Sequence, residues 1–183
     1  MESSQLEAER SIATDISMSF WPFLPNNVLV VGQQSASLAT CIAEILPMTR
    51  VTLVTIDSLP ISSLHFNQFI DRINVVSGWQ GVYNSGYPII LAVSHFLPLE
   101  SEDQVHFLST ALRYLEADGR VLLLEKTIDD SNSQLTHMVN LCHSAGFFDV
   151  TISPMENTPW ISILFRREKD SLRCREPTAH CLA

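Results

Sequence analysis

Small, acidic and basic residues lie one or two positions after several apolar runs in this sequence. A short run that is apolar at every position is typical of a strand buried inside a parallel sheet. The carboxyl ends of parallel strands meet at one edge of the sheet, where ligands of open α/β sheets bind. We therefore expect these residues to converge on one crevice, which could hold a small molecule and exchange a proton with it. They are Gly32, Asp57, Gly78 and His95.

His95 and Glu125 are the two residues expected to carry catalysis. A histidine is a suitable general base because it titrates close to neutral pH. Glu125 could orient a substrate group at the carboxyl edge of the sheet. Two alternatives stay open, in which His95 only caps the end of a strand and Glu125 is a solvated strand end.

Aromatic residues near the same edge could form the wall of the crevice. Trp79 and Tyr83 lie in a glycine-containing loop, where they could stack on an adenine or an aromatic substrate, or cover the sheet edge instead. If the crevice is used, Trp79 and Phe96 should line its apolar wall. If the protein is only a scaffold, Gln34 and Trp79 should fill that space with their own side chains.

The apolar periodicity predicts seven strands that mostly alternate with helices. Such alternation implies right-handed crossovers and a parallel sheet with helices on both faces. The last two strands have no helix between them, so the sheet should end in an antiparallel pair. The expected strands are 28–31, 51–56, 73–76, 89–93, 121–124, 148–152 and 160–165, and the expected helices are 35–46, 64–70, 101–117 and 131–145.

Particular residues should start and stop these helices. Ser35 is expected to cap the helix that runs to residue 46. Asp118 and Gly119 are expected to end the helix that opens at residue 101. Residues 1–25 should form an N-terminal helix and aromatic segment, 26–167 the α/β domain, and 168–183 a flexible tail. Basic residues crowd near that tail and are interpreted as solvated: Arg166, Arg167, Lys169, Arg173 and Arg175.

The composition is typical of one globular domain and excludes several kinds of partner. Hydrophobic residues make up 46% of the 183 residues and charged residues 17%, the reverse of a disordered chain. A net charge of -9 argues against a nucleic-acid partner, because phosphate binding needs clustered cations. No apolar run is long enough to span a membrane, and the polar, acidic start is unlike a secretory signal, so we expect a cytoplasmic protein. The four cysteines lack the close spacing of a zinc site, and no metal is expected.

Several phrases of the sequence resemble class I S-adenosylmethionine-dependent methyltransferases. Residues 28–36 resemble the glycine-rich first motif, and Asp57 falls where that family keeps an acid after the second strand. Residues 115–125 are similar to the family's sequence that leads into its fifth strand. Residues 144–147 are similar to the family's motif just before its sixth strand. The resemblance implies a Rossmann-like, doubly wound, mostly parallel seven-stranded sheet with an antiparallel terminal pair. It also implies an S-adenosylmethionine site, for which the expected contacts are Gly32, Gln34, Asp57, Gly78, Trp79 and Ser94.

The sequence departs from the family's pattern at several of these cofactor positions. Gln34 and Ala36 stand where the family prefers glycines, and Val30 replaces an acid within the first strand. Trp79 stands near the acid expected after strand three, and Pro88 at the acid expected at the start of strand four. We therefore expect weak or absent binding of the cofactor.

Three functions are compatible with the sequence. The first is a methyltransferase that acts on a small molecule. The second is a non-catalytic protein of the same fold that serves as a scaffold, or whose pocket a protein partner completes. The third is a cyclase or isomerase that uses the same pocket without the cofactor. Fold alone does not choose among them.

Overall fold

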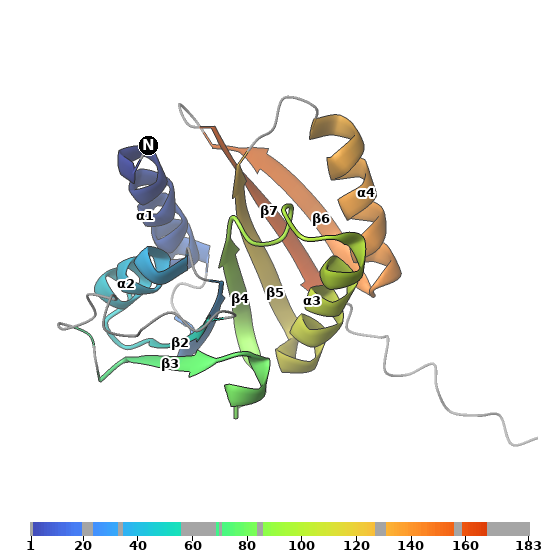
Figure 1. Ribbon diagram of the computed structural model, residues 1–183. Helices are drawn as coiled ribbons and strands as arrows, with labels where there is room; N and C mark the ends of the chain where they lie inside the picture. The colour runs from blue at the N-terminus through green and yellow to red at the C-terminus, as the bar shows by residue number, and fades with distance from the viewer. Residues whose placement is uncertain are drawn as a thin grey trace, which may run out of the picture.

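One seven-stranded sheet organises the chain, in the order β3-β2-β1-β4-β5-β7-β6 (Figure 1). The computed structural model describes residues 2–19, 24–32, 35–55, 69, 71–83, 86–126, 131–155 and 159–167. The strands are β1 (Asn27–Val31), β2 (Arg50–Thr55), β3 (Ile73–Ser77), β4 (Tyr87–Val93), β5 (Leu115–Lys126), β6 (Phe147–Pro154) and β7 (Trp160–Arg167). The helices are α1 (Glu2–Ser19), α2 (Ala36–Ile45), α3 (Ser101–Tyr114) and α4 (Ser131–Ser144), with a 3-10 turn, η3 (Trp79–Gly81).

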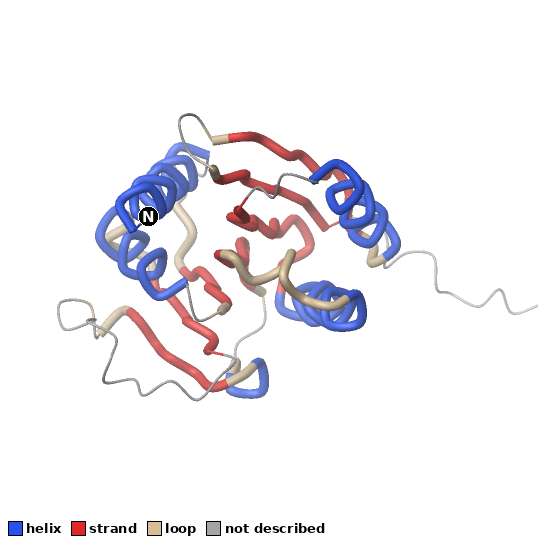
Figure 2. Tube along the Cα trace, turned by 45° about the horizontal axis from the view of Figure 1, so that its top comes forward, coloured by secondary structure: helices blue, strands red, loops and turns tan. Residues whose placement is uncertain are grey.

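The strand directions confirm the predicted fold class. The first five strands, β1 to β5, run parallel to one another, whereas β7 runs antiparallel to both β5 and β6. Helices lie on both sides of the strands, as Figure 2 shows. The carboxyl ends of β1 to β5 therefore share one edge of the sheet, which is the edge that the sequence predicts for the crevice.

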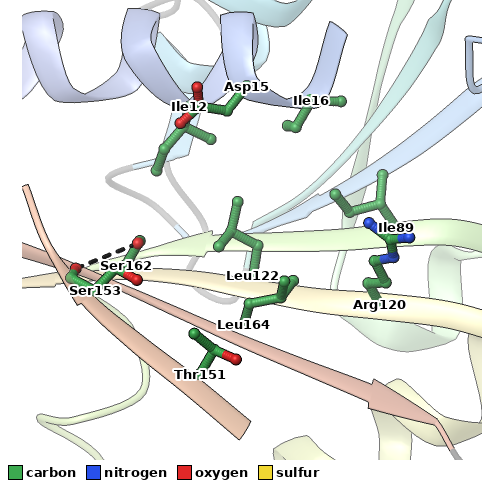
Figure 3. A pocket seen from close by; sticks show the side chains of 10 residues that line it. All are labelled: Ile12, Asp15, Ile16, Ile89, Arg120, Leu122, Thr151, Ser153, Ser162 and Leu164. Carbon is green, nitrogen blue, oxygen red and sulfur yellow. Dashed lines mark hydrogen bonds between the residues drawn. The ribbon is translucent and has the colours of Figure 1, made fainter. Parts of the chain in front are cut away.

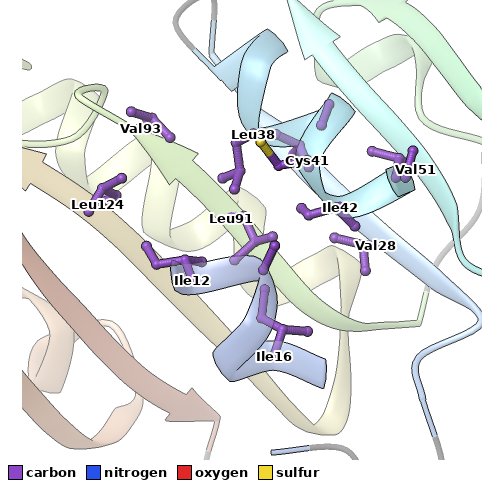
Figure 4. Packing of buried hydrophobic residues seen from close by; sticks show 14 of the residues in the cluster. Ile12, Ile16, Val28, Leu38, Cys41, Ile42, Val51, Leu91, Val93 and Leu124 are labelled. Carbon is purple, nitrogen blue, oxygen red and sulfur yellow. The ribbon is translucent and has the colours of Figure 1, made fainter. Parts of the chain in front are cut away.

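Alternate side chains of the central strands enter two separate hydrophobic cores. Val28 and Val30 of β1 pack with α1 and α2, where Ile12 of α1 and Ile42 of α2 are buried (Figure 4). Leu29 and Val31, which point the other way, join the core beneath α3 and α4. Both faces are apolar because a parallel sheet is covered by helices on both sides.

The start of β5 differs from the prediction. α3 ends at Tyr114 and β5 begins at once with Leu115, so residues 118–119 lie within the strand and do not stop the helix. Gly119 is needed there for space: an added Cβ would lie 3.0 Å from the carbonyl oxygens of both Glu116 and Tyr87. The periodicity of the helix gave no sign of this close approach.

Ser35 occupies the expected position before α2 but does not cap the helix with its side chain. Its buried hydroxyl donates to the carbonyl oxygen of Val31 at 2.6 Å and accepts from the backbone N–H of Val93 at 3.0 Å. The side chain therefore joins the ends of β1 and β4. This role depends on a contact between residues far apart in the sequence, which a capping rule does not foresee.

Some expectations fall outside the described residues. These include the loop residue Gln34, the acid Asp57, nearly all of the helix expected at 64–70, and the tail at 168–183. Among the helices of the described ranges, none has the length and apolar character that a membrane span requires.

Replacing Ser35 with alanine should destabilise the fold. The variant would leave the buried N–H of Val93 without its acceptor, a loss of about 1–3 kcal/mol. Urea unfolding measures this free energy. Ser37→Ala, at an exposed position of α2, is the matched control and should change it little. Equal stability of the two variants would contradict the bridging role.

Candidate active site

A cleft of about 370 Å³ opens at the carboxyl ends of β3 and β4. Its walls come from the turn after β3, from the loop between β4 and α3, and from the first two turns of α3. The volume lies within the range of about 300–1,000 Å³ typical of small-molecule sites. The cleft is lined by Gly78, Trp79, Gln80, His95, Leu99, Asp103, His106 and Phe107.

The loop after β4 turns sharply and brings His95 to the wall of the cleft. Ser94 adopts a φ of +47°, a left-handed conformation that is uncommon outside glycine. Its backbone N–H donates to the carbonyl oxygen of Leu124 at 2.8 Å. Ser94 itself is not among the residues that line the cleft, although it was expected to contact the cofactor.

Glu125 holds this loop from beneath. One of its oxygens, Oε1, accepts hydrogen bonds from the backbone N–H groups of His95 at 3.1 Å and Phe96 at 2.8 Å. Glu125 is only 1% exposed. The interpretation of Glu125 as a solvated strand end is therefore wrong: the carboxyl group is buried and fixes the backbone of the loop.

Burial changes the acid-base behaviour of Glu125. Loss of water around the carboxyl group raises its pKa from the ordinary value of 4.5 to about 7. The N–H groups of Phe96, His95 and Leu97 oppose this rise, because they stabilise the charged carboxylate. Glu125 is therefore poised to change charge close to neutral pH.

Gln104 holds the same loop from the side of α3, a role that the sequence did not suggest. Its Nε2 donates to the carbonyl oxygen of Phe96 at 3.1 Å, and the side chain is buried. Phe96 is fully buried and packs edge-on against Phe107, with ring centroids 5.6 Å apart. The expectation that Phe96 lines the wall is therefore wrong. The sequence did contain one signal. Gln104 lies three positions before Phe107 and four before Leu108, so it shares the buried face of the helix with these apolar residues.

Trp79 forms an aromatic wall with side chains of α3. Its ring stacks on Tyr114 at a centroid distance of 5.6 Å and meets Phe107 edge-on at 5.8 Å. The hydroxyl of Tyr114 donates to the carbonyl oxygen of Trp79 at 2.9 Å, which fixes η3 against α3. Tyr83, by contrast, is 92% exposed and does not line the cleft.

Gly32 and Gly78 lie at the same edge and allow close approaches. Gly32 has a φ of +100°, and an added Cβ would lie 3.2 Å from Cγ of His95. Gly78 has a φ of +66° and donates its N–H to the carbonyl oxygen of Thr55 at 2.7 Å. The structure thus brings Gly32, Gly78 and His95 together, as predicted, while Asp57 lies outside the described residues.

Two further polar side chains line the cleft from α3. Asp103 and His106 are both exposed, and both are among the residues that line the cleft. No cluster of three or more His, Cys, Asp or Glu residues in the described part of the chain is arranged to hold a metal ion.

Solved structures of methyltransferases share this arrangement of strands and helices. The mitomycin 7-O-methyltransferase matches with a TM-score of 0.71 at 18% identity, over 88% of this chain and 53% of its own. Human N-acetylserotonin methyltransferase in complex with S-adenosylmethionine matches with a TM-score of 0.67 at 16% identity. That match covers 89% of this chain and 55% of the human enzyme. The mostly parallel seven-stranded sheet with an antiparallel terminal pair is the architecture that the resemblance implied. The chain has the class I methyltransferase fold.

A third enzyme of the class I methyltransferase fold matches over more of its own length. The 1,6-didemethyltoxoflavin-N1-methyltransferase of Burkholderia thailandensis, with bound 1,6-didemethyltoxoflavin and S-adenosylhomocysteine, has a TM-score of 0.68 at 16% identity. The match covers 88% of this chain and 78% of that enzyme. The chain spans about half the length of the other two enzymes. No protein-family profile and no curated protein matches the sequence.

The buried carboxyl group makes stability depend on pH. Because the pKa of Glu125 is higher in the fold than in the unfolded chain, its contribution is fully present below about 4.5 and is lost as the pH rises to about 7. The difference corresponds to about 3 kcal/mol. Glu125→Gln stays neutral and keeps an acceptor oxygen, so it should be more stable than the wild type at pH 8 and similar at pH 4.5.

Denaturant unfolding at several pH values measures this effect. Glu116→Gln, at an exposed position of the same strand, serves as the control and should leave the pH dependence unchanged. A Glu125→Gln variant that lost stability equally at pH 4.5 and pH 8 would contradict the raised pKa.

Proposed function

We propose that this chain is a small-molecule methyltransferase with a weakened S-adenosylmethionine site, in which His95 is the general base. The observation that carries the proposal is the attachment of the His95 backbone to the buried carboxyl group of Glu125. A histidine held in this way at the wall of a small-molecule cleft is well placed to accept a proton. The small-molecule methyltransferases that share the fold support the same conclusion.

The described side of the cleft fits an adenosyl group. The ring of Trp79 lines the cleft, and a nucleobase can stack on an aromatic ring of this kind. Gly78, which has no Cβ, leaves room at this wall of the cleft for the side-chain amide of Gln80. Trp79 stands in the turn after β3, near the position where the family has an acid. An adenine ring there would therefore lack one polar contact. This is the physical basis for a weakened site.

The residues of the cleft would have separate roles in methyl transfer. S-adenosylmethionine, when bound, would supply an electrophilic methyl group and leave as S-adenosylhomocysteine. The imidazole of His95 would accept the proton of a substrate hydroxyl and so make its oxygen nucleophilic. Glu125 and Gln104 hold the loop and thereby fix the direction of the imidazole. Trp79, Leu99 and Phe107 exclude water from the apolar part of the cleft.

One observation favours a second candidate, a non-catalytic protein of the same fold. Trp79 packs on both Tyr114 and Phe107 and so occupies the place of the expected acid with an apolar ring. A site that had lost its polar contacts in this way could keep the fold without turnover. Binding measurements distinguish the two candidates.

Titration calorimetry with S-adenosylhomocysteine tests the cofactor site. We expect a dissociation constant at the weak end of the range of about 1 µM–1 mM in which enzymes hold their substrates. Trp79→Ala should weaken binding about tenfold, because stacking on a base is worth about 1–3 kcal/mol. Tyr83→Ala, in the same loop but exposed, is the control and should bind like the wild type. No heat of binding at millimolar ligand would favour the non-catalytic candidate.

Methyl transfer from radiolabelled S-adenosylmethionine to a panel of hydroxylated aromatic compounds tests the role of His95. We expect His95→Gln to lower kcat by about 10²–10⁴-fold, the usual contribution of a general base. His137→Gln, on the exposed side of α4, should keep full activity. A His95→Gln variant as active as the wild type would remove His95 from the mechanism.

A further inference from the structure

Two polar side chains of α3 line the cleft beside its aromatic residues. Asp103 and His106 are three positions apart, so they share one face of the helix, and both are exposed. In the part of the chain that the structure describes, neither side chain forms a hydrogen bond or an ion pair. Both are therefore available to a ligand in the cleft without giving up a contact inside the protein.

The two side chains offer complementary groups. An ionised carboxylate such as that of Asp103 only accepts hydrogen bonds, whereas the neutral imidazole of His106 offers one N–H donor. An acceptor beside a donor matches a flat heterocycle whose edge carries a donor beside an acceptor. Adenine has this edge, because its 6-amino group donates and the neighbouring ring nitrogen N1 accepts. Hypoxanthine has the reverse order, since its 6-oxo oxygen accepts and its N1–H donates.

An aromatic ring beside these groups completes a site for a base. Trp79 is half-buried and lines the same cleft, so part of its ring is accessible to a ligand. Proteins that bind a single nucleobase combine stacking on aromatic or apolar side chains with hydrogen bonds to the edge of the base. Trp79 offers the first kind of contact, and Asp103 with His106 offers the second.

The hollow beneath α1, on the opposite face of the sheet, has a different lining (Figure 3). Ile12 and Ile16 of α1 lie across it from Leu122 and Leu164 of the sheet, and Asp15 lies on its wall. None of the described residues that line it is aromatic, and it shares no lining residue with the cleft. Of these two sites, only the cleft therefore offers a purine a described aromatic surface.

We propose that Asp103 makes the cleft selective for adenine, by accepting a hydrogen bond from the 6-amino group while His106 donates one to N1. The inference rests on the proposed function, in which the adenine belongs to S-adenosylmethionine. It places recognition of the base on α3, whereas the turn after β3 presents the apolar ring of Trp79. Asp103 also lies in the first turn of α3, where an acid favours the helix dipole, and Glu102 beside it provides a matched control for that effect.

Titration calorimetry with two ligands tests the selectivity. The ligands are S-adenosylhomocysteine and S-inosylhomocysteine, in which hypoxanthine replaces adenine. The wild type should bind the adenine ligand about tenfold more tightly or better, because the 6-oxo oxygen of the other would face the carboxylate of Asp103. In Asp103→Asn the amide can donate as well as accept, so the preference should fall below about twofold. His106→Leu should weaken binding of the adenine ligand severalfold through loss of the donor.

Two variants serve as controls, and circular dichroism checks that each variant is folded. Glu102→Gln removes the neighbouring acid, which is exposed and does not line the cleft. Asp15→Asn removes the acid from the wall of the hollow beneath α1. Both variants should keep the preference of the wild type.

The outcomes separate this inference from the proposed function. If S-adenosylhomocysteine binds but Asp103→Asn keeps the preference of Glu102→Gln, or the wild type binds both ligands equally, the inference is overturned and the methyltransferase proposal stands. Failure to bind S-adenosylhomocysteine would count against the methyltransferase, and titration with adenosine and inosine would then decide the role of Asp103. A preference for adenosine that Asp103→Asn abolishes would support that role, whereas no binding or no preference would overturn it.

Discussion

The contact between the carboxyl group of Glu125 and the loop after β4 is the constraint on which the candidate site depends. A buried acid is costly unless its oxygens are hydrogen-bonded, and the N–H groups of His95 and Phe96 offset part of this cost at Oε1 of Glu125. The bonds in turn satisfy the backbone donors of His95 and Phe96. The same interaction therefore stabilises an acid inside the fold and presents an imidazole at its edge.

The rest of the site is assembled around that loop. Ser35 joins the ends of β1 and β4, and Gln104 joins the loop to α3. Trp79 is fixed to α3 through Tyr114, so the turn after β3 and the loop after β4 both rest on one helix. Each attachment is a hydrogen bond between a side chain and the backbone. Together these bonds fix the walls of the cleft to the sheet and to α3, so the loops alone do not determine their position.

The sequence predicted the sheet better than it predicted the site. Apolar runs such as 28–31 and 121–124 locate buried strands because burial on both faces leaves no place for polar residues. Side-chain contacts between distant segments leave no such pattern, which explains why Ser35 was expected to cap a helix and Glu125 was considered a solvated strand end. The position of Phe96 was misjudged for a similar reason, since the direction of a side chain in a sharp turn depends on a backbone angle that composition does not reveal.

Gly32 has a consequence for how such a site can change over time. Its missing Cβ makes room for the ring of His95, and not only for a ligand above the sheet. A lineage that stopped using the cofactor could therefore lose the glycines that follow along the same loop, while any side chain at Gly32 would still displace the imidazole. The first glycine of such a motif would then be retained after the others are lost, because the packing of the imidazole requires it. Its presence alone would therefore be a poor marker of an intact nucleotide pocket.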